Sequence, residues 1–317
     1  MNEEATAVVF GASGLVGSGI EEALRGSRAL KHILAPTHKE VDLLDLESIT
    51  SYFSKMQPDI VIMAAGQVGG ILFNVETQHE QFTINFKMNF NLIEACLLSK
   101  IDNLYLLSSS CIYPESANTP MFEKDIFNGL PHSTNEGYAI AKSAAVRQVL
   151  LYRRIYGLNW KVLVPTNIYG PNDKFNGRAH VIPHLILKVS ESIKLQNREI
   201  VVAGDGTPIR EFLLNTELGN AVRHLIETNV DFDILNISSG EPVKISSLVE
   251  MICEIFEFEG EVFFDHSLPN GHPNKTLDIR LLNEIGWFNQ VKLQDGLQNV
   301  IESFSRGKNS IGPRLKE

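Results

Sequence analysis

The stretch Val8-Val9-Phe10-Gly11-Ala12-Ser13-Gly14-Leu15-Val16-Gly17 decides the fold, because it places glycines at positions i, i+3 and i+6 between an apolar run and a helical pattern. The first glycine allows a tight turn, the second lets a pyrophosphate approach the backbone, and the third lets the helix pack close to the strand. The phosphates would lie at the N-terminus of that helix. A glycine pattern alone is weak evidence, but its place in the first strand–turn–helix unit predicts dinucleotide binding.

Strands and helices alternate along the first half of the chain. Ala5–Phe10 and Asp59–Ala65 are apolar runs with almost no polar interruption, which is typical of parallel strands buried on both faces. Further strands are expected at His32–Ala35, Leu104–Ser108 and Trp160–Pro165, with helices at Leu15–Leu24, Leu46–Lys55 and Gln78–Ser99 and another from Gly137. This alternation predicts an α/β protein with a doubly wound parallel sheet of the Rossmann type.

The pattern becomes irregular after Asn167, and it predicts a smaller α/β lobe that forms the substrate side of a cleft. We expect residues 1–170 to form the dinucleotide-binding domain and residues 171–317 to form mainly the substrate domain. A segment at about 205–235, which contains a helix at Glu217–Glu227, is expected to return to the first domain. The other elements expected in this half are helices at His180–Ser192, Ser246–Phe256 and Leu293–Ser305, and strands at Ile200–Val202 and Val262–Phe264.

Charge and cysteine content narrow the class of protein. The formal net charge of −10 argues against a nucleic acid or an anionic membrane as partner, because both favour a basic surface. The acidic N-terminus has no signal-peptide character, and no apolar run approaches the roughly 20 residues of a membrane span. Cys96, Cys111 and Cys253 form no CxxC pair, which argues against disulfides or a bound metal and favours the cytoplasm.

The residues after the second expected strand bear on the choice of cofactor. An acidic residue there would hold the ribose hydroxyls of NAD, whereas basic residues accommodate the 2′-phosphate of NADP. The segment Ala35-Pro36-Thr37-His38-Lys39 has no acid in the immediate position and two basic side chains. We therefore expect NADP(H), although a solvated basic pair on a turn would give the same sequence.

Tyr138 and Lys142 lie at positions i and i+4 near the start of an expected helix, so they share one face. An ammonium close to a phenol favours tyrosinate, and would lower the pKa of Tyr138 towards the working pH. The serines of Ser108–Ser110 end the fourth expected strand, at the edge where parallel sheets bind ligands. Ser109 can orient a substrate carbonyl beside Tyr138, and the three residues together predict a ketone-reducing site.

These motifs resemble the extended short-chain dehydrogenase/reductase family, and within it the GDP-L-fucose synthase family. The similarity runs almost from end to end of the chain. It rests on AAGQVGGI (Ala64–Ile71), SSSCIYP (Ser108–Pro114), EGYAIAK (Glu136–Lys142), PTNIYGPND (Pro165–Asp173), HVIP (His180–Pro183), GTPIREF (Gly206–Phe212), DHSLPNGHPNK (Asp265–Lys275) and IGWF (Ile285–Phe288). The resemblance implies an NADPH-dependent enzyme that epimerises a GDP-4-keto-6-deoxyhexose at C3 and C5 and then reduces its C4 ketone.

The resemblance implies a role for each residue of the site. Cys111 and His180 would exchange the protons next to the ketone, and a thiol and an imidazole suit that chemistry because both titrate near neutral pH. Ser109, Tyr138 and Lys142 would serve the reduction. The cofactor would contact Gly11, Ala12, Ser13, Gly14, Leu15, Val16, Gly17, His38, Lys39, Val41, Ala64, Ala65, Gly66, Leu107, Ser108, Tyr138, Lys142, Pro165, Asn167, Ile168 and His180. The substrate would contact Ser109, Ser110, Cys111, Asn167, Lys188, Ala203, Arg210, Asn270 and Lys275.

Three positions depart from the family pattern at the nucleotide end. Lys188 stands where the family commonly has Arg, Ala203 where it has Trp, and Asn270 where it has Asp. These changes leave the chemistry in place but widen the choice of sugar. A dideoxyhexose of the colitose type or a heptose, with or without epimerisation, therefore stays open.

Two other classes of function and the oligomeric state are also weighed. A non-catalytic NADP(H)-binding regulator would have no need of Ser109, Tyr138 and Lys142. A dehydratase would usually carry an acidic pair where this chain has Cys111 and Ile112. In relatives, the helices corresponding to Gln78–Ser99 and Gly137–Tyr156 form a four-helix dimer interface, so we expect a homodimer, although internal packing alone would explain their apolar residues.

Overall fold

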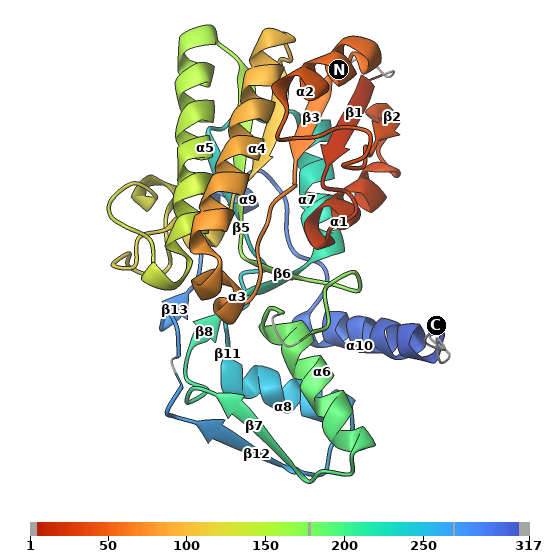
Figure 1. Cartoon of the computed structure of the whole chain (residues 1–317), viewed down its shortest axis with the longest axis vertical. Coiled ribbons are helices and arrows are strands. Elements are labelled where there is room, and N and C mark those ends of the chain that lie inside the picture. Colours follow the sequence, from red (N-terminus) through yellow and green to blue (C-terminus); the bar gives the residue numbers. More distant parts are fainter. Residues whose placement is uncertain (1–4, 177–178, 269, 311–317) are drawn as a thin grey trace.

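The computed structural model describes residues 5–176, 179–268 and 270–310 (Figure 1). A six-stranded parallel sheet lies at its centre, with the strand order β10-β5-β4-β3-β1-β2. Its strands are β1 (Ala5–Phe10), β2 (Leu30–Leu34), β3 (Ile60–Met63), β4 (Asn103–Leu107), β5 (Asn159–Pro165) and β10 (Ile234–Ile237). The predicted doubly wound α/β fold is confirmed. The strand order reverses between β1 and β3, and a ligand crevice is expected at that point.

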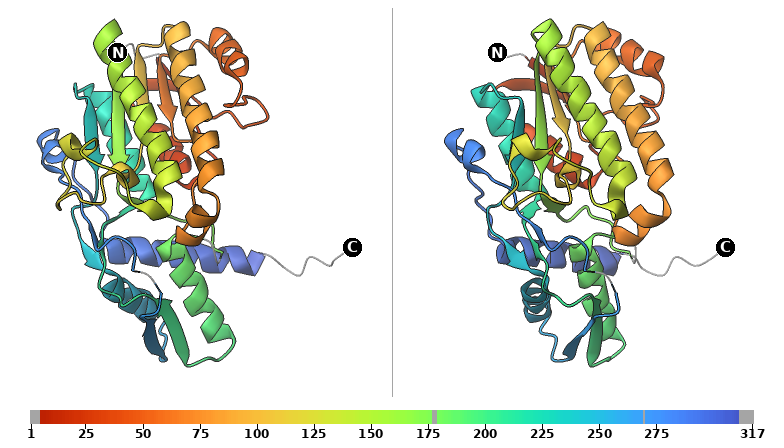
Figure 2. Two further views of the ribbon diagram at one scale, coloured as in Figure 1. Left: turned by 60° about the vertical axis from the view of Figure 1, so that its left-hand side comes forward. Right: turned by 90° about the vertical axis from the view of Figure 1, so that its left-hand side faces the viewer.

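Helices cover both faces of the sheet, because alternate residues of each strand point to opposite sides. Val8 and Phe10 of β1 belong to the apolar core on one face, whereas Ala7 and Val9 belong to the core on the other. The first face carries α2 (Leu46–Met56), α4 (Gln78–Leu98) and α5 (Glu136–Tyr156), and the second carries α1 (Leu15–Leu24), α7 (Asn215–Thr228) and α9 (Arg280–Glu284). Figure 2 shows these two helical layers on either side of the sheet.

A separate core holds the lower part of the molecule together (Figures 1 and 2). It is formed by α6 (Val181–Lys194), α8 (Ile245–Ile255), α10 (Leu293–Ser310) and the parallel pair β7 (Glu199–Ala203) and β12 (Glu261–Asp265). Smaller pairings connect it to the main sheet: β6 (Asn167–Tyr169) with β9 (Phe212–Leu214), and β8 (Ile209–Arg210) with β11 (Val243–Lys244) and β13 (Asn274–Lys275).

The second half of the chain contributes to both parts. The helix α7 packs on α1, and the approach is so close that a Cβ atom on Gly219 would lie 2.1 Å from the carbonyl oxygen of Gly19. The strand β10 completes the main sheet, and α9 packs beside it. We therefore propose that the segment returning to the dinucleotide-binding part extends past residue 235 to the end of β10, and that α9 returns as well.

Most expected elements are present, with their ends moved by one or two residues, and α10 runs five residues past its expected end. The elements that were not expected are the short helix α3 (Ile71–Glu76) between β3 and α4 and, in the second half of the chain, α9, β6, β8, β9, β10, β11 and β13. His180 is the N-cap of α6 and not its first helical residue. Within the described part of the chain, no helix is both long and apolar enough to cross a membrane.

Candidate active site

The turn between β1 and α1 has the geometry that a pyrophosphate needs. The amide of Gly14 donates to the carbonyl oxygen of Gly11 over 2.9 Å, which closes the turn. A Cβ on Gly17 would lie 2.2 Å from that same oxygen, and a Cβ on Gly11, whose φ is +87°, would lie 2.6 Å from the amide nitrogen of Ala65. Gly14 caps α1 with no side-chain cap and no acidic residue follows in the first turn, so the helix N-terminus can accept an anion. These residues fit a dinucleotide.

The ends of β3 and β4 approach the same turn. A Cβ on Gly66 would lie 3.3 Å from Oδ1 of Asn85 and 3.9 Å from Nζ of Lys142. The Lys142 ammonium is 2% exposed and donates to the carbonyl oxygen of Leu107 over 2.9 Å. The Oγ atom of Ser108 is buried and has no hydrogen-bond partner among the described residues. The predicted cofactor residues of three strands thus converge, and they leave a polar group for a ligand to satisfy.

Other predicted cofactor residues come from neighbouring elements. Val41 is buried in the core that α2 shares with the sheet. Pro165 ends β5, and Ile168 packs from β6 against the core on the other face of the sheet. The side-chain amide of Asn167 donates to the carbonyl oxygen of Glu211 over 3.0 Å. Asn167 therefore connects β6 to the residue that follows Arg210.

The loop after β2 exposes the two predicted basic residues. His38 and Lys39 are both solvent-exposed. The carboxylate of Glu40 accepts hydrogen bonds from the backbone amide of Thr37 over 2.8 Å and from its hydroxyl over 2.9 Å, which lowers the pKa of Glu40. The sequence reasoning did not weigh this acid. Its position three residues after Thr37 is the feature that could have revealed it, because such spacing is typical of a side chain that closes a turn.

Ser109, Cys111 and Tyr138 meet at the carboxyl end of β4. Oγ of Ser109 accepts from the backbone amide of Cys111 over 3.2 Å and starts the short 3₁₀ turn Ser110–Ile112. The same hydroxyl hydrogen-bonds to Tyr138, which is 6% exposed near the start of α5. A neutral phenol beside a serine hydroxyl is arranged to hold and protonate a carbonyl oxygen.

The expected effect of Lys142 on Tyr138 is not found. Burial raises the pKa of Tyr138, the nearby Cys111 raises it further, and the Ser109 hydrogen bond lowers it only in part. Burial likewise lowers the pKa of Lys142 to about 8. The expectation treated the two side chains as a charge pair in water, whereas desolvation in the interior penalises both charged forms. Tyr138 is therefore a protonated donor in this structure.

Two cations from the second half of the chain interact with Cys111. Nζ of Lys275 lies 3.8 Å from the Cys111 sulfur and donates to it. Lys275 of β13 is paired in register with Arg210 of β8. Burial lowers the pKa of Arg210 to about 10, while the Cys111 thiolate would raise it, and one guanidinium nitrogen donates to the carbonyl oxygen of Ile209 over 2.8 Å. The two residues, both of which were expected to contact the substrate, thus also interact with the sulfur.

His180, the other residue expected to exchange protons, makes no described contact with Cys111 or Tyr138. Its side chain is solvent-exposed, yet enough protein surrounds it for desolvation to lower its pKa. Among the described residues, no hydrogen bond or charge interaction joins His180 to Cys111 or Tyr138. Its role opposite Cys111 stays a prediction.

The three departures from the family pattern lie further down, around β7. The ammonium of Lys188 donates to the carbonyl oxygen of Val201, and Ala203 ends β7 with its side chain exposed. Oδ1 of Asn270 accepts from the amide of Asp205 over 2.8 Å. Asn270 and Lys188 therefore have partners within the protein, and no described contact brings them to Cys111. Ser110, by contrast, is buried directly beside it in the 3₁₀ turn.

His272 is a further residue of the site that the sequence reasoning missed. Its Nε2 lies 3.1 Å from the carbonyl oxygen of Glu115, and its ring is 6.4 Å from that of His132. Burial lowers the pKa of His272, and the charges of Lys275 and Arg210 lower it further. Its position three residues before Lys275, in the motif Asp265–Lys275, is the sequence feature that could have indicated it.

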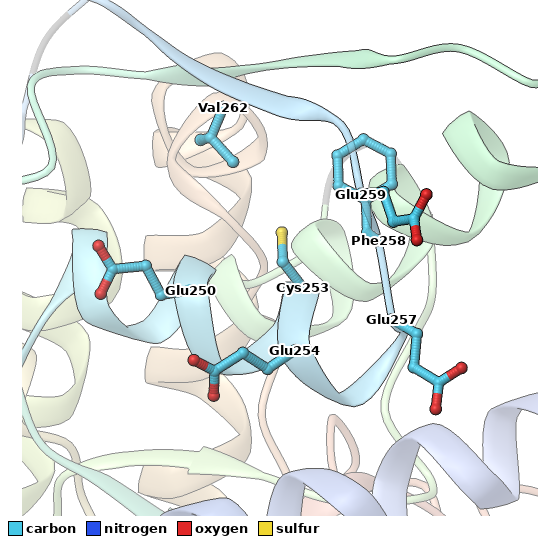
Figure 3. A pocket seen from close by; sticks show the side chains of 7 residues that line it. All are labelled: Glu250, Cys253, Glu254, Glu257, Phe258, Glu259 and Val262. Carbon is cyan, nitrogen blue, oxygen red and sulfur yellow. The ribbon is translucent and has the colours of Figure 1, made fainter.

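A pocket of about 550 Å³ lies in the second half of the chain (Figure 3). It is open and lies between α8 and β12, where glutamates surround the thiol of Cys253. None of the predicted site residues lines it. The candidate site is therefore placed by its side-chain geometry and not by this cavity.

Comparison with known proteins shows which family the chain resembles in sequence and in fold. The NAD dependent epimerase/dehydratase family matches residues 7–238 of this chain. A GDP-L-fucose synthase of Escherichia coli is 34% identical over 306 residues, covering 93% of this chain and 95% of that protein. A GDP-L-colitose synthase of Yersinia pseudotuberculosis is 33% identical over 307 residues, covering 96% and 99%. A solved structure of a GDP-L-fucose synthetase from Naegleria fowleri bound to NADP has a TM-score of 0.86 at 24% identity, covering 98% of this chain and 97% of that one.

Proposed function

The chain belongs to the NAD dependent epimerase/dehydratase family, and from that premise we propose that it epimerises and then reduces a GDP-linked 4-keto-6-deoxyhexose. The observation that carries the proposal is the cluster of Ser109, Cys111 and Tyr138 with Lys142 buried beside the dinucleotide turn. Relatives named GDP-L-fucose synthase at 34% identity over nearly the whole chain support it.

We propose NADPH as the cofactor, which when bound supplies the hydride for C4. The turn at Gly11–Gly17 would hold its pyrophosphate, Lys142 its nicotinamide ribose, and His38 with Lys39 its 2′-phosphate. Replacing Lys39 with Ala should weaken NADPH binding by about tenfold and leave NADH binding unchanged, because one exposed charge contact to a phosphate is lost. Fluorescence titration of both cofactors measures this, and equal weakening of both would contradict the assignment to the phosphate.

The epimerase half uses the acidity of the protons at C3 and C5, which lie next to the C4 ketone. The thiolate of Cys111 takes one such proton, the electron pair moves to the C4 oxygen, and a proton returns to the carbon from the opposite ring face. His180 is proposed as the group on that face. Ser109 and Tyr138 hold the C4 oxygen while it carries negative charge.

The reductase half uses the same oxygen. The protonated Tyr138 donates its proton to the C4 oxygen as the ketone becomes an alcohol, and Ser109 keeps the carbonyl aligned. Lys142 orients the cofactor beside the sugar. Because burial raises its pKa, the phenol of Tyr138 stays protonated and can donate throughout the neutral pH range.

The test separates the two halves. In D₂O with NADPH and GDP-4-keto-6-deoxymannose, the wild-type protein should oxidise NADPH and place deuterium at C3 and C5 of the product. Cys111→Ser should lose the deuterium and keep ketone reduction, whereas Tyr138→Phe should slow NADPH oxidation by about 10²–10⁴-fold.

Cys253→Ser is the matched control, since Cys253 lies on α8 in the separate pocket; it should behave as the wild type. Reduction without any deuterium in the wild-type product would exclude the epimerase half. No NADPH oxidation with any keto-sugar nucleotide would favour a cofactor-binding regulator instead.

A related substrate is the second candidate. The exposed end of β7 at Ala203 lacks the large side chain expected there, and a relative at 33% identity is named GDP-L-colitose synthase. A dideoxyhexose or a heptose is distinguished by comparing kcat/KM over a panel of GDP-linked 4-keto sugars. A clear preference for the 3-deoxy sugar would replace the main substrate and leave the roles of Cys111 and Tyr138 in place.

We also propose the cytoplasm as the compartment, because Cys111 must remain a free thiol to act as a base. The three cysteines of the chain are all free, and burial raises the pKa of Cys96 and of Cys253.

A further inference from the structure

We propose that Lys275 is a positioning residue for Cys111, and that its ammonium keeps the sulfur in the thiolate form that the epimerisation requires. This rests on the proposed function only for the use of the thiolate. The contact itself belongs to the protein without any ligand, because Nζ of Lys275 donates to the Cys111 sulfur over 3.8 Å.

The fold brings the two residues together across 164 positions of sequence. Cys111 sits in the 3₁₀ turn that follows β4, and Lys275 sits on β13, which pairs with β8 beneath it. Both side chains are half-buried. An ion pair at this depth is less screened by solvent and salt than one on the surface.

The other charged and titratable groups around the sulfur agree with this assignment. Tyr138 faces it from α5 and is neutral, and Arg210 faces it from β8. His272, the next group out, interacts with Lys275 and Arg210 but not directly with the sulfur. Arg210 directs a guanidinium nitrogen to its neighbour's carbonyl oxygen, whereas Lys275 directs its ammonium at the sulfur. Lys275 is therefore the cation that makes a hydrogen bond to the sulfur, while Arg210 acts on it through charge alone.

The role of Lys275 requires no transfer of its own proton. The thiolate takes a proton from the carbon next to the ketone and becomes a thiol, while the electron pair of the broken C–H bond moves to the C4 oxygen. When the thiol later gives its proton up, the ammonium again faces a thiolate. Lys275 thus determines the fraction of molecules in which Cys111 is a thiolate. It takes no part in the proton transfer itself.

Alkylation of Cys111 by iodoacetamide tests this in the complete protein without substrate, because only the thiolate reacts. Peptide mass spectrometry follows each cysteine separately over a pH series. In Lys275→Met, alkylation of Cys111 at pH 7 should slow by about tenfold and its pH midpoint should rise by about one unit, the size expected for loss of an opposite charge at this distance. Lys275→Arg should restore most of the wild-type rate.

Controls are present in the same chain. Lys244→Met removes a lysine from the same small sheet, but Lys244 is exposed on β11, so the rate at Cys111 should not change. The buried thiols of Cys96 and Cys253 should stay slow in every variant. Fast alkylation of Cys96 would reveal that Lys275→Met has unfolded. In that case the alkylation rates of Cys111 are compared between Lys275→Gln and Lys275→Arg.

An unchanged pH profile of Cys111 in folded Lys275→Met or Lys275→Gln would overturn the proposal. Deuterium incorporation gives a second readout: it should fall with the thiolate fraction and recover at higher pH in Lys275→Met, whereas a lysine needed only for substrate binding would raise KM at every pH. If the wild type incorporates no deuterium but alkylation of Cys111 depends on Lys275, the proposed epimerase function is wrong, whereas the proposed effect of Lys275 on Cys111 is supported.

Discussion

At the scale of single residues, Lys142 shows a conflict between stability and function. Its ammonium is fully buried, and burial lowers its pKa to about 8, against about 10.4 for an exposed lysine. Below pH 8 both the folded and the unfolded chain bind this proton, so the folded state carries the full cost of burying the charge. Between pH 8 and about 10 the folded state releases the proton while the unfolded state keeps it, so stability rises with pH over that window.

Lys142→Met should therefore stabilise the protein without cofactor while it destroys activity. We expect the free energy of unfolding at pH 7 to increase by roughly 1–3 kcal/mol, since a shift of this size corresponds to a few kcal/mol and the lost hydrogen bond to Leu107 offsets part of it. The gain should shrink as the pH approaches 10. Urea denaturation at several pH values measures it, with the exposed Lys244→Met as control. A gain independent of pH would mean that packing, and not charge burial, is responsible.

Site residues could be predicted from the sequence where residues that act together lie close together in the chain. Tyr138 and Lys142 are four residues apart, and Ser109 ends a strand, so spacing alone placed them on one site. The contact between Cys111 and Lys275 could not be foreseen from the residues, because it depends on how β13 pairs with β8. The effect of burial on Tyr138 was also missed, since a sequence does not state how much water a side chain retains.

At the scale of elements, the crossing of α1 and α7 fixes the dinucleotide turn. A Cβ on Gly219 would lie 2.1 Å from the carbonyl oxygen of Gly19 and 2.9 Å from Cβ of Ala23. Both of these neighbours are atoms of α1 that cannot move without the helix. The N-terminus of α1 carries Gly14, so a shift of this helix reaches the pyrophosphate site directly.

Gly219→Ala should destabilise the protein although alanine is the better helix former. Helix propensity would favour alanine by about 1 kcal/mol, whereas forcing two backbones apart costs about 1–3 kcal/mol or more. We expect a net loss of about 1–2 kcal/mol in denaturant unfolding and a weaker affinity for NADPH. Glu22→Ala, on the exposed side of α1, is the matched control and should leave both quantities unchanged. A stabilised Gly219→Ala would show that the helices can separate freely.

Elements with a strong apolar period were predicted well, and those set by tertiary contacts were not. The strands β1 and β3 were evident because both of their faces are buried, which leaves no polar residue in the run. The short helix α3 was not evident, because it begins at a glycine with no side-chain cap and depends on its packing against the turn before α5. The two-residue strands β8, β11 and β13 carry no pattern at all, yet β8 and β13 hold Arg210 and Lys275.

At the scale of the whole molecule, an aromatic stripe remains exposed on α4. Phe82, Phe86 and Phe90 recur every four residues on one face, and they stack with ring centroids 5.7 and 6.1 Å apart. Each is about two-fifths exposed, at 39%, 39% and 42%. The neighbouring α5 exposes Leu151 and Ile155 in the same layer. Apolar side chains gathered in this way favour burial against a partner surface.

We propose that a second copy of the chain covers this stripe, so that α4 and α5 of two protomers form a four-helix interface. A two-fold axis would bring each stripe onto its equivalent, which makes the contact self-complementary. Phe86→Glu places a charge at the centre of the stripe and should convert the dimer to a monomer, because a buried unpaired carboxylate costs several kcal/mol. Phe263→Glu, which changes an exposed phenylalanine on β12, should have no effect.

Light scattering after size exclusion measures the outcome as a change from twice the chain mass of 35.3 kDa to that mass itself. The monomeric variant should still oxidise NADPH with substrate, because Ser109, Cys111, Tyr138, Lys142 and Lys275 all come from one chain. Their positions on α5 also separate the two functions of that helix: Tyr138 and Lys142 lie in its first two turns, whereas Leu151 and Ile155 lie towards its end. A wild-type protein that is monomeric at micromolar concentration would refute the interface. A monomeric Phe86→Glu without activity would instead show that the partner holds α5, and with it the proton donor, in place.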